Sequence, residues 1–321
     1  MTGNQTYTID MDEPAPDGRL LQYSAYYPKS VRVRPGDTVV FDNKSKQSIH
    51  TVTFGVSADR KDQPSPVTKD VEGNPVVFGP CYTTESPTAG MVACPGAPAG
   101  PPTGAPPPAP DWTGTGYWNS GQVVYEIPGI PSPPPAEARK ATVKLADSIA
   151  PGSYPFLCLL HPYMDGTLEV VNADEDRLSP DAVAKAGDQA AQVDVEAAGK
   201  LAEPKGTTET GKATVVSGAG DKVVSINQYF PAALTVKAGD TVTFKNESPY
   251  EPHTVTFQSP FKTPEDPGAL KPGGVGKGKA YQGGFAHSGL IGPAPFFPSD
   301  SFSLRFTKAG EYSYLCLLHP A

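Results

Sequence analysis

Three residues that can bind a soft metal ion lie at steps of three near the middle of the sequence. Cys158, His161 and Met164 offer a thiolate, an imidazole and a thioether directly after the strand-like run 152–157. A trigonal site of one Cys and two His, with a long axial Met, suits copper that cycles between its two oxidation states. The motif therefore predicts a copper site, provided that a second histidine comes from elsewhere in the chain.

The same pattern returns at the C-terminal end of the sequence. Cys316 and His319 have the spacing of Cys158 and His161, and a proline follows the histidine in both copies. Such a proline fixes φ and stiffens the loop beside the histidine. The sequence stops one residue before the place of a second Met, so we expect the natural chain to continue with a Met and a closing strand.

An internal repeat supplies the second histidine of each site. Residues 26–41 align with 229–244, and both copies continue without a gap to a His-Thr-Val-Thr-Phe sequence that starts at His50 and at His253. A repeat of this kind indicates two homologous domains in tandem. Four of the five histidines fall in these places, and we expect two copper ions per chain. The predicted metal ligands are His50, Cys158, His161 and Met164 in the first domain, and His253, Cys316 and His319 in the second.

The pattern within each copy is that of β-structure. Apolar and polar residues alternate over 31–41 and over 234–244, on either side of a Gly-Asp turn, which predicts a hairpin with one buried face. Pro and Gly are abundant, at 38 and 33 residues, and disfavour long helices. An all-β chain of antiparallel sandwiches is therefore expected. Further strands are predicted over 51–54, 141–145, 152–157, 166–171, 254–257 and 301–306.

The two copies differ between the first histidine and the cysteine. The first domain carries a Pro-rich insert at about 58–136, and the second a shorter counterpart at about 259–300. Cys81 and Cys94 lie close together in the insert, and a disulfide between them is expected because a loop with little core gains from a covalent link. That bond would indicate an oxidising compartment, whereas two free thiols would be compatible with the cytosol. Trp112, Tyr117 and Trp118 are expected to pack this loop rather than to form an electron path.

A helix is predicted between the two copies. Ser179 is a good N-cap, Pro180 a good first helical residue, and residues 181–202 are rich in Ala, Asp, Glu and Lys before Pro204. A helical connector would fix the spacing of the domains better than a Gly/Ser chain. The predicted organisation is a first domain at 1–176, a helical connector at 177–211 and a second domain at 212–321.

Taken together, these motifs resemble the plastocyanin/azurin family of cupredoxins. The Gly-Asp-Thr-Val turn, the His-Thr-Val sequence, the Asn-Ser-Gly island at 119–121 and the Cys-Leu-Leu-His-Pro-Tyr-Met loop carry the resemblance, and the short loop is similar to that of amicyanin. The resemblance implies two tandem cupredoxin-like Greek-key β-sandwiches, each with a type 1 copper at one end. It also implies that His161 and His319 are exposed ligands in an apolar patch, and that Thr51 and Thr254 tether the cysteine loops.

The expected function is that of a soluble electron-transfer protein, not an enzyme, which passes single electrons between redox protein partners. Multicopper oxidases and copper nitrite reductases need additional histidines, but this sequence has no His-x-His, and only His287 is left over. We expect His287 to be a surface or hydrogen-bonded residue rather than a ligand. Copper storage or delivery is poorly supported by four methionines, whereas a module of a larger cell-surface assembly, with the Pro-rich insert as a docking surface, stays open.

Net charge and hydropathy restrict the partners and the cellular location that can be expected for this chain. The net charge of −8 disfavours nucleic acid and anionic membranes as partners, since both attract basic surfaces. No run is long and apolar enough to span a bilayer, and residues 1–20 have no apolar core of a signal peptide. An extracytoplasmic location, periplasmic, cell-surface or secreted, is expected from the predicted disulfide and the resemblance, and the sequence leaves the oligomeric state open.

Overall fold

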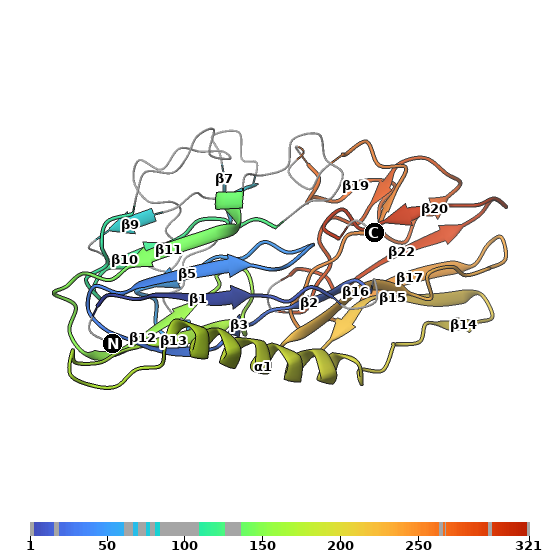
Figure 1. Cartoon of the computed structure of the whole chain (residues 1–321). Helices are drawn as coiled ribbons and strands as arrows, with labels where there is room; N and C mark the ends of the chain where they lie inside the picture. Colours follow the sequence, from blue (N-terminus) through green and yellow to red (C-terminus); the bar gives the residue numbers. More distant parts are fainter. Residues whose placement is uncertain are drawn as a thin grey trace. The chain divides into compact units, whose positions relative to one another are not determined.

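The chain is dominated by β-strands that gather into two compact units (Figure 1). The computed structural model describes residues 3–15, 19–60, 67–69, 75–77, 81–83, 109–125, 136–262, 266, 268–294 and 297–319. Unit 1 comprises residues 1–15 and 23–196, and unit 2 comprises residues 16–22 and 197–321. No helix among the described residues has the length and apolar character needed to cross a membrane.

Unit 1 contains two main sheets. One has the strand order β11-β5-β1-β3, and the other the order β4-β13-β12-β6-β10-β9. The first sheet consists of β1 (Thr6–Met11), β3 (Tyr26–Tyr27), β5 (Thr38–Asn43) and β11 (Lys140–Lys144). The second consists of β4 (Ser30–Val33), β6 (Thr53–Phe54), β9 (Cys81–Thr83), β10 (Tyr117–Asn119), β12 (Gly152–Leu157) and β13 (Asp165–Val170). The strands predicted over 141–145, 152–157 and 166–171 are thereby confirmed to within one residue.

The hairpin predicted over 31–41 is wrong. β4 pairs in parallel with β13, whereas β5 pairs with β1 and β11 in the other sheet. The Gly-Asp turn is therefore a corner between the two sheets. Asp37 holds this corner because its buried carboxylate accepts the backbone amides of Gln5 and Arg34 and pairs with Arg177.

Aromatic side chains fill the core of unit 1. Tyr26, Phe41, Phe54 and Phe156 are fully buried, and their rings meet edge to face or tilted. Such contacts add roughly 0.5–1.5 kcal/mol each beyond the burial of area. Trp112, Tyr117 and Trp118 are also buried, as expected for residues that pack the insert.

Part of the insert forms strands. β7 (Val67–Lys69) pairs with β8 (Pro75–Val77), and β9 pairs with β10. Cys81 begins β9 and is buried. Its predicted partner Cys94 lies outside the described residues, so the disulfide stays a prediction.

Unit 2 repeats this plan in part. A seven-stranded sheet has the order β2-β16-β15-β17-β22-β20, with β14 beside β15, and a four-stranded sheet has the order β19-β21-β18-β23. The first contains β2 (Leu21–Tyr23), β14 (Thr207–Glu209), β15 (Lys212–Gly220), β16 (Val224–Phe230), β17 (Thr241–Asn246), β20 (Ala280–Tyr281) and β22 (Ser301–Phe306). The second contains β18 (Thr256–Phe257), β19 (Gly273–Gly274), β21 (Ala286–His287) and β23 (Tyr314–Leu315).

The strand predicted over 234–236 is absent from unit 2. Its counterpart in unit 1, β4, has β13 as its strand neighbour, and among the described residues of unit 2 no strand takes the place of β13. A cavity of about 920 Å³ is lined mainly by residues 227–238 and 308–316. Residues 234–236 thus have the alternation of a strand but lack the partner that would complete its hydrogen bonds.

The predicted helix is present as α1 (Pro180–Ala198). The Ser179 hydroxyl accepts the Ala182 amide at 3.2 Å, which is the expected N-cap bond. Val183 belongs to the core of unit 1, and Asp194 accepts the Tyr27 hydroxyl at 2.7 Å. The helix therefore packs on unit 1 over most of its length; its role in spacing two domains stays a prediction.

Candidate metal centres

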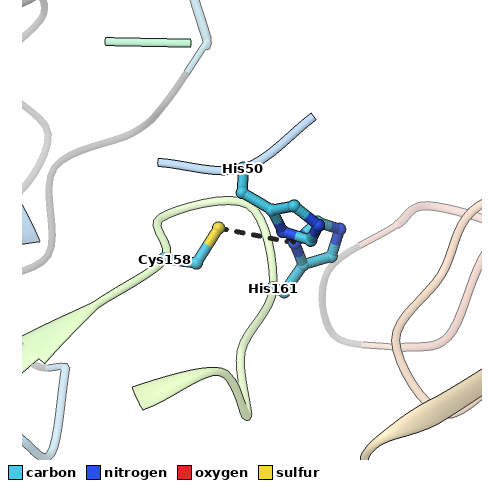
Figure 2. Close-up of side chains that lie close together, drawn as sticks. All are labelled: His50, Cys158 and His161. Atoms are coloured by element: carbon cyan, nitrogen blue, oxygen red, sulfur yellow. Dashed lines mark hydrogen bonds between the residues drawn. The ribbon is translucent and has the colours of Figure 1, made fainter. Parts of the chain in front are cut away.

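Three of the four residues predicted to bind metal in unit 1, His50, Cys158 and His161, lie close together (Figure 2). His50 pairs with Val123 in an isolated bridge before β6, and Cys158 and His161 follow β12. The Cys158 Sγ lies 3.4 Å from the His161 Nδ1, and the Nδ1 atoms of the two histidines lie 3.1 Å apart. All three side chains are buried, so their nitrogens and sulfur face each other rather than water.

This donor set fits a copper ion. A thiolate and two imidazole Nδ1 atoms lie within 4.8 Å of one another, and this combination of donors is the trigonal part of a blue-copper site. Met164 is fully buried in the same core cluster as Cys158. The loop between them is closed by hydrogen bonds from the Met164 amide to the His161 carbonyl and from the Cys158 amide to the Met164 carbonyl.

Unit 2 contains a second cluster of the same kind. The Cys316 Sγ lies 3.8 Å from the His253 Nδ1 and 3.5 Å from the His319 Nδ1. The ring centroids of the two histidines are 4.8 Å apart and tilted by 53°, against 4.8 Å and 54° in unit 1. The described residues therefore contain two His–Cys–His groups of nearly identical geometry.

Threonines tether both cysteine loops, as the resemblance implied. Thr51 donates its amide to the Cys158 Sγ at 3.3 Å, and its hydroxyl accepts the Leu159 amide at 2.8 Å. Thr254 makes the same two contacts, at 3.4 Å to the Cys316 Sγ and 2.8 Å from the Leu317 amide. Each threonine thus fixes the sulfur and the residue that follows it.

Replacing Thr254 with Val is expected to destabilise unit 2 by about 1–3 kcal/mol, because it removes the acceptor of the buried Leu317 amide. Urea denaturation followed by circular dichroism measures the loss. Replacing the exposed Thr208 with Val is the matched control and should change stability little. Equal stability of the two variants would show that the tether contributes nothing.

The electrostatics of both clusters favour thiolates. Burial raises the pKa of Cys158, but the His161 and His50 imidazoles outweigh it and hold that pKa well below its usual range. Burial also raises the pKa of Cys316, but the His319 and His253 imidazoles outweigh this effect and hold that pKa well below its usual range. The thiolate is the metal-binding form of cysteine, so these surroundings favour the form that binds metal.

Two carboxylates that the sequence did not indicate contact the outer ring nitrogens of His50 and His319. The Asp12 Oδ2 lies 3.2 Å from the His50 Nε2, and the Glu251 Oε1 lies 3.1 Å from the His319 Nε2. Burial lowers the pKa of His319, but Cys316 and Glu251 raise it to about 9. Burial likewise lowers the pKa of His50, while Asp12 and Cys158 raise it above its ordinary value overall.

Arg60 is a third residue that the sequence did not indicate. Its guanidinium donates to the Cys158 carbonyl at 2.8 Å and to the Met164 carbonyl at 2.9 Å. These carbonyls mark the two ends of the ligand loop in unit 1. Arg60 therefore joins the ends of the loop that carries three of the four predicted ligands.

The expected exposure of two histidines needs correction, whereas the expectation for His287 is met. His161 and His319 are each 5% exposed, so they are not the exposed ligands that the resemblance implied. The His161 ring packs against the ring of His50, and Glu251 lies against the outer nitrogen of His319. His287 is hydrogen-bonded, as predicted, but it is fully buried: its ring nitrogens lie 2.8 Å from the Thr256 Oγ1 and 2.8 Å from the Ala269 carbonyl.

Comparison with known proteins also finds similarity to copper-binding proteins. A model of the family "Copper binding proteins, plastocyanin/azurin family" matches residues 213–321. Chloroplast plastocyanin of Chlamydomonas reinhardtii is 26% identical over 129 residues, which cover 38% of this chain and 76% of the relative. That of Tetradesmus obliquus is 32% identical over 91 residues, covering 28% of this chain and 50% of the relative.

Solved structures of small copper proteins are also similar. Dithionite-reduced auracyanin from Roseiflexus castenholzii aligns with 16% identity and a TM-score of 0.26, covering 53% of this chain and 99% of its own. Plastocyanin from the fern Dryopteris crassirhizoma aligns with 14% identity and a TM-score of 0.23, covering 51% and 99%. The family match at residues 213–321 includes His253, Cys316 and His319, so this region of the chain is similar to the plastocyanin/azurin family of copper-binding proteins.

Proposed function

We propose that each unit binds one type 1 copper ion and that the chain carries single electrons between redox protein partners. The observation that carries the proposal is the double occurrence of a buried Cys–His–His cluster whose donor atoms all lie within 4.8 Å of one another. In unit 1 the ligands are His50, Cys158, His161 and Met164. In unit 2 they are His253, Cys316 and His319.

The surroundings of the clusters support this function. Bound copper would supply a one-electron redox couple with a coordination that changes little between oxidation states. The chain's part is to hold sulfur and nitrogen in place: Thr51 and Thr254 fix the thiolates, and burial excludes water from them. Ligands that the surrounding residues hold in place are what rapid electron exchange requires.

The wider organisation belongs to the same proposal. We assign units 1 and 2 to tandem cupredoxin-like Greek-key sandwiches, with α1 and residues 199–211 as the connection. The two related plastocyanins are chloroplast proteins, and an extracytoplasmic location is proposed for this chain as well. Redox proteins are the proposed partners.

An electron carrier fits better than a copper enzyme. A catalytic copper would need further histidines, and His287, the one histidine outside the two clusters, has both ring nitrogens engaged by Thr256 and Ala269. The proposal is therefore that the chain is not an enzyme. Turnover of nitrite or of a phenol by the copper-loaded protein would contradict it.

Copper titration tests the proposal. The purified chain should take up two Cu(II) per molecule and become intensely blue through thiolate-to-copper charge transfer. Cys158→Ser and Cys316→Ser should each remove one copper and its part of the absorption, and the double variant should remove both. Ser153→Ala, an exposed change in β12, is the control and should keep both coppers. A colourless protein, or uptake of zinc alone, would overturn the proposal.

A further inference from the structure

The repeat extends to a position that the sequence alignment did not reach. Thr6 of β1 pairs with Thr38, and Lys212 of β15 pairs with Thr241, the repeat counterpart of Thr38. Counting along both strands places Asp12 and Gly218 at equivalent positions, directly after the paired residues. Both have left-handed backbones, with φ of 63° and 73°. The two units thus differ by a carboxylate at one structurally matched site.

In unit 1 the side chain at this position supports the strand-borne histidine. The Asp12 Oδ2 lies 3.2 Å from the His50 Nε2, and both side chains have no exposed surface. The Asp12 Oδ1 accepts the amides of Glu13 and Tyr23, each at 2.7 Å. The carboxylate is therefore held by its second oxygen while the first faces the imidazole.

In unit 2 the equivalent position has no side chain. A Cβ added at Gly218 would lie 2.0 Å from the His253 Nε2, so the ring occupies the space that a side chain would need. The His253 Nε2 is buried and has no hydrogen-bond partner among the described residues. The strand-borne histidine of unit 2 therefore lacks the carboxylate that its counterpart has.

Unit 2 has its carboxylate elsewhere. Glu251 is two residues before His253, where unit 1 has Ser48 before His50. The Glu251 Oε1 lies 3.1 Å from the Nε2 of the loop histidine, His319, and its Oε2 accepts a hydrogen bond from the Gln22 side-chain Nε2 at 3.3 Å. Among the described residues, a buried carboxylate thus contacts the strand-borne histidine in unit 1 and the loop histidine in unit 2.

We propose that Asp12 and Glu251 are positioning residues that orient His50 in one site and His319 in the other, and thereby make the two copper centres chemically unequal. The inference rests on the proposed binding of copper. A carboxylate that accepts the Nε2 proton fixes the tautomer, turns the Nδ1 lone pair toward the metal and strengthens that imidazole as a donor. The carboxylate therefore acts on the strand histidine in unit 1 and on the loop histidine in unit 2.

The two centres can be measured one at a time in parent variants that keep only one site, into which further substitutions are then introduced. Cys316→Ser leaves only the unit 1 site and Cys158→Ser only the unit 2 site. In the first parent, Asp12→Asn should lower Cu(II) affinity about 10–100-fold, which is typical for loss of such a partner. It should also raise the reduction potential and change the copper hyperfine splitting in electron paramagnetic resonance. Glu251→Gln should do the same in the second parent.

Controls and a transplant sharpen the test. Asp111→Asn and Glu247→Gln remove exposed carboxylates that pair with Lys144 and Lys245, and should leave affinity and spectra unchanged. In the Cys316→Ser parent, Asp12→Gly with Ser48→Glu should move the spectrum toward that of the unit 2 site. Circular dichroism verifies folding of each variant.

The possible results are distinct. Parents that bind no copper contradict the proposed function itself. Parents that bind blue copper, with Asp12→Asn and Glu251→Gln leaving affinity, potential and spectrum like those of the controls, overturn the positioning roles. Identical spectra for the two parents overturn the inequality of the centres.

Discussion

Replacing Arg177 with Met is expected to destabilise unit 1 by about 3–5 kcal/mol, the usual cost of leaving one partner of a buried ion pair uncompensated. The Arg177 Nη1 lies 2.5 Å from the Asp37 Oδ2, and the two side chains are 3% and 0% exposed. Asp37 also accepts the amides of Gln5 and Arg34, so its carboxylate is fixed at the corner between the sheets. Methionine fills similar volume but leaves that carboxylate without its cation.

Tryptophan fluorescence during urea denaturation measures this effect selectively. Both tryptophans of the chain, Trp112 and Trp118, lie buried in unit 1. The matched control is Arg32→Met, which removes an exposed ion pair with Glu169 and should cost no more than about 1 kcal/mol. If Arg177→Met were as mild as Arg32→Met, the buried pair would not stabilise the corner.

The sequence predicts individual strands of this protein better than their neighbours. Alternation places Val31 and Val33, and likewise Val39 and Phe41, on buried faces, and the structure buries all four. Alternation reports burial of one face, however, and says nothing of which strand lies alongside. The partner of β4 is β13, more than 130 positions later in the chain, and the choice depends on the corner at Asp37. Long-range contacts of this kind leave no local pattern.

The metal ligands could be predicted from the sequence for a different reason. Cysteine and histidine are rare in this chain, so their repeated spacing stands out against the background. The residues that support them are common types without characteristic spacing. Asp12 follows β1, and its contact with His50 is visible only once β1 lies beside β5. The alternating run Thr6–Met11 predicts a strand in principle, but neither its position in the sheet nor the role of the residue after it follows from that pattern.

Replacing Arg60 with Met is expected to loosen the ligand loop of unit 1 and to cost about 2–3 kcal/mol, because two charged hydrogen bonds to the Cys158 and Met164 carbonyls are lost. Arg60 has a φ of 58°, an unfavourable backbone for a non-glycine residue that persists where surrounding contacts determine it. Burial lowers the pKa of Arg60, and the Cys158 thiolate is the first of the groups that raise it. The guanidinium therefore links the two ends of the ligand loop.

Tryptophan fluorescence and the copper signal report the two consequences separately. Arg60→Met should unfold at lower urea and, in the Cys316→Ser background, bind Cu(II) about 10–100-fold more weakly, as expected for loss of a group that orients ligands. Arg60→Lys should restore only part of the stability, since a single ammonium cannot reproduce the forked geometry that reaches both carbonyls. Arg32→Met is again the control for loss of an exposed arginine. Unchanged unfolding and an unchanged copper spectrum in Arg60→Met would mean that the bonds from Cys158 to Met164 and from Met164 to His161 hold the loop without the arginine.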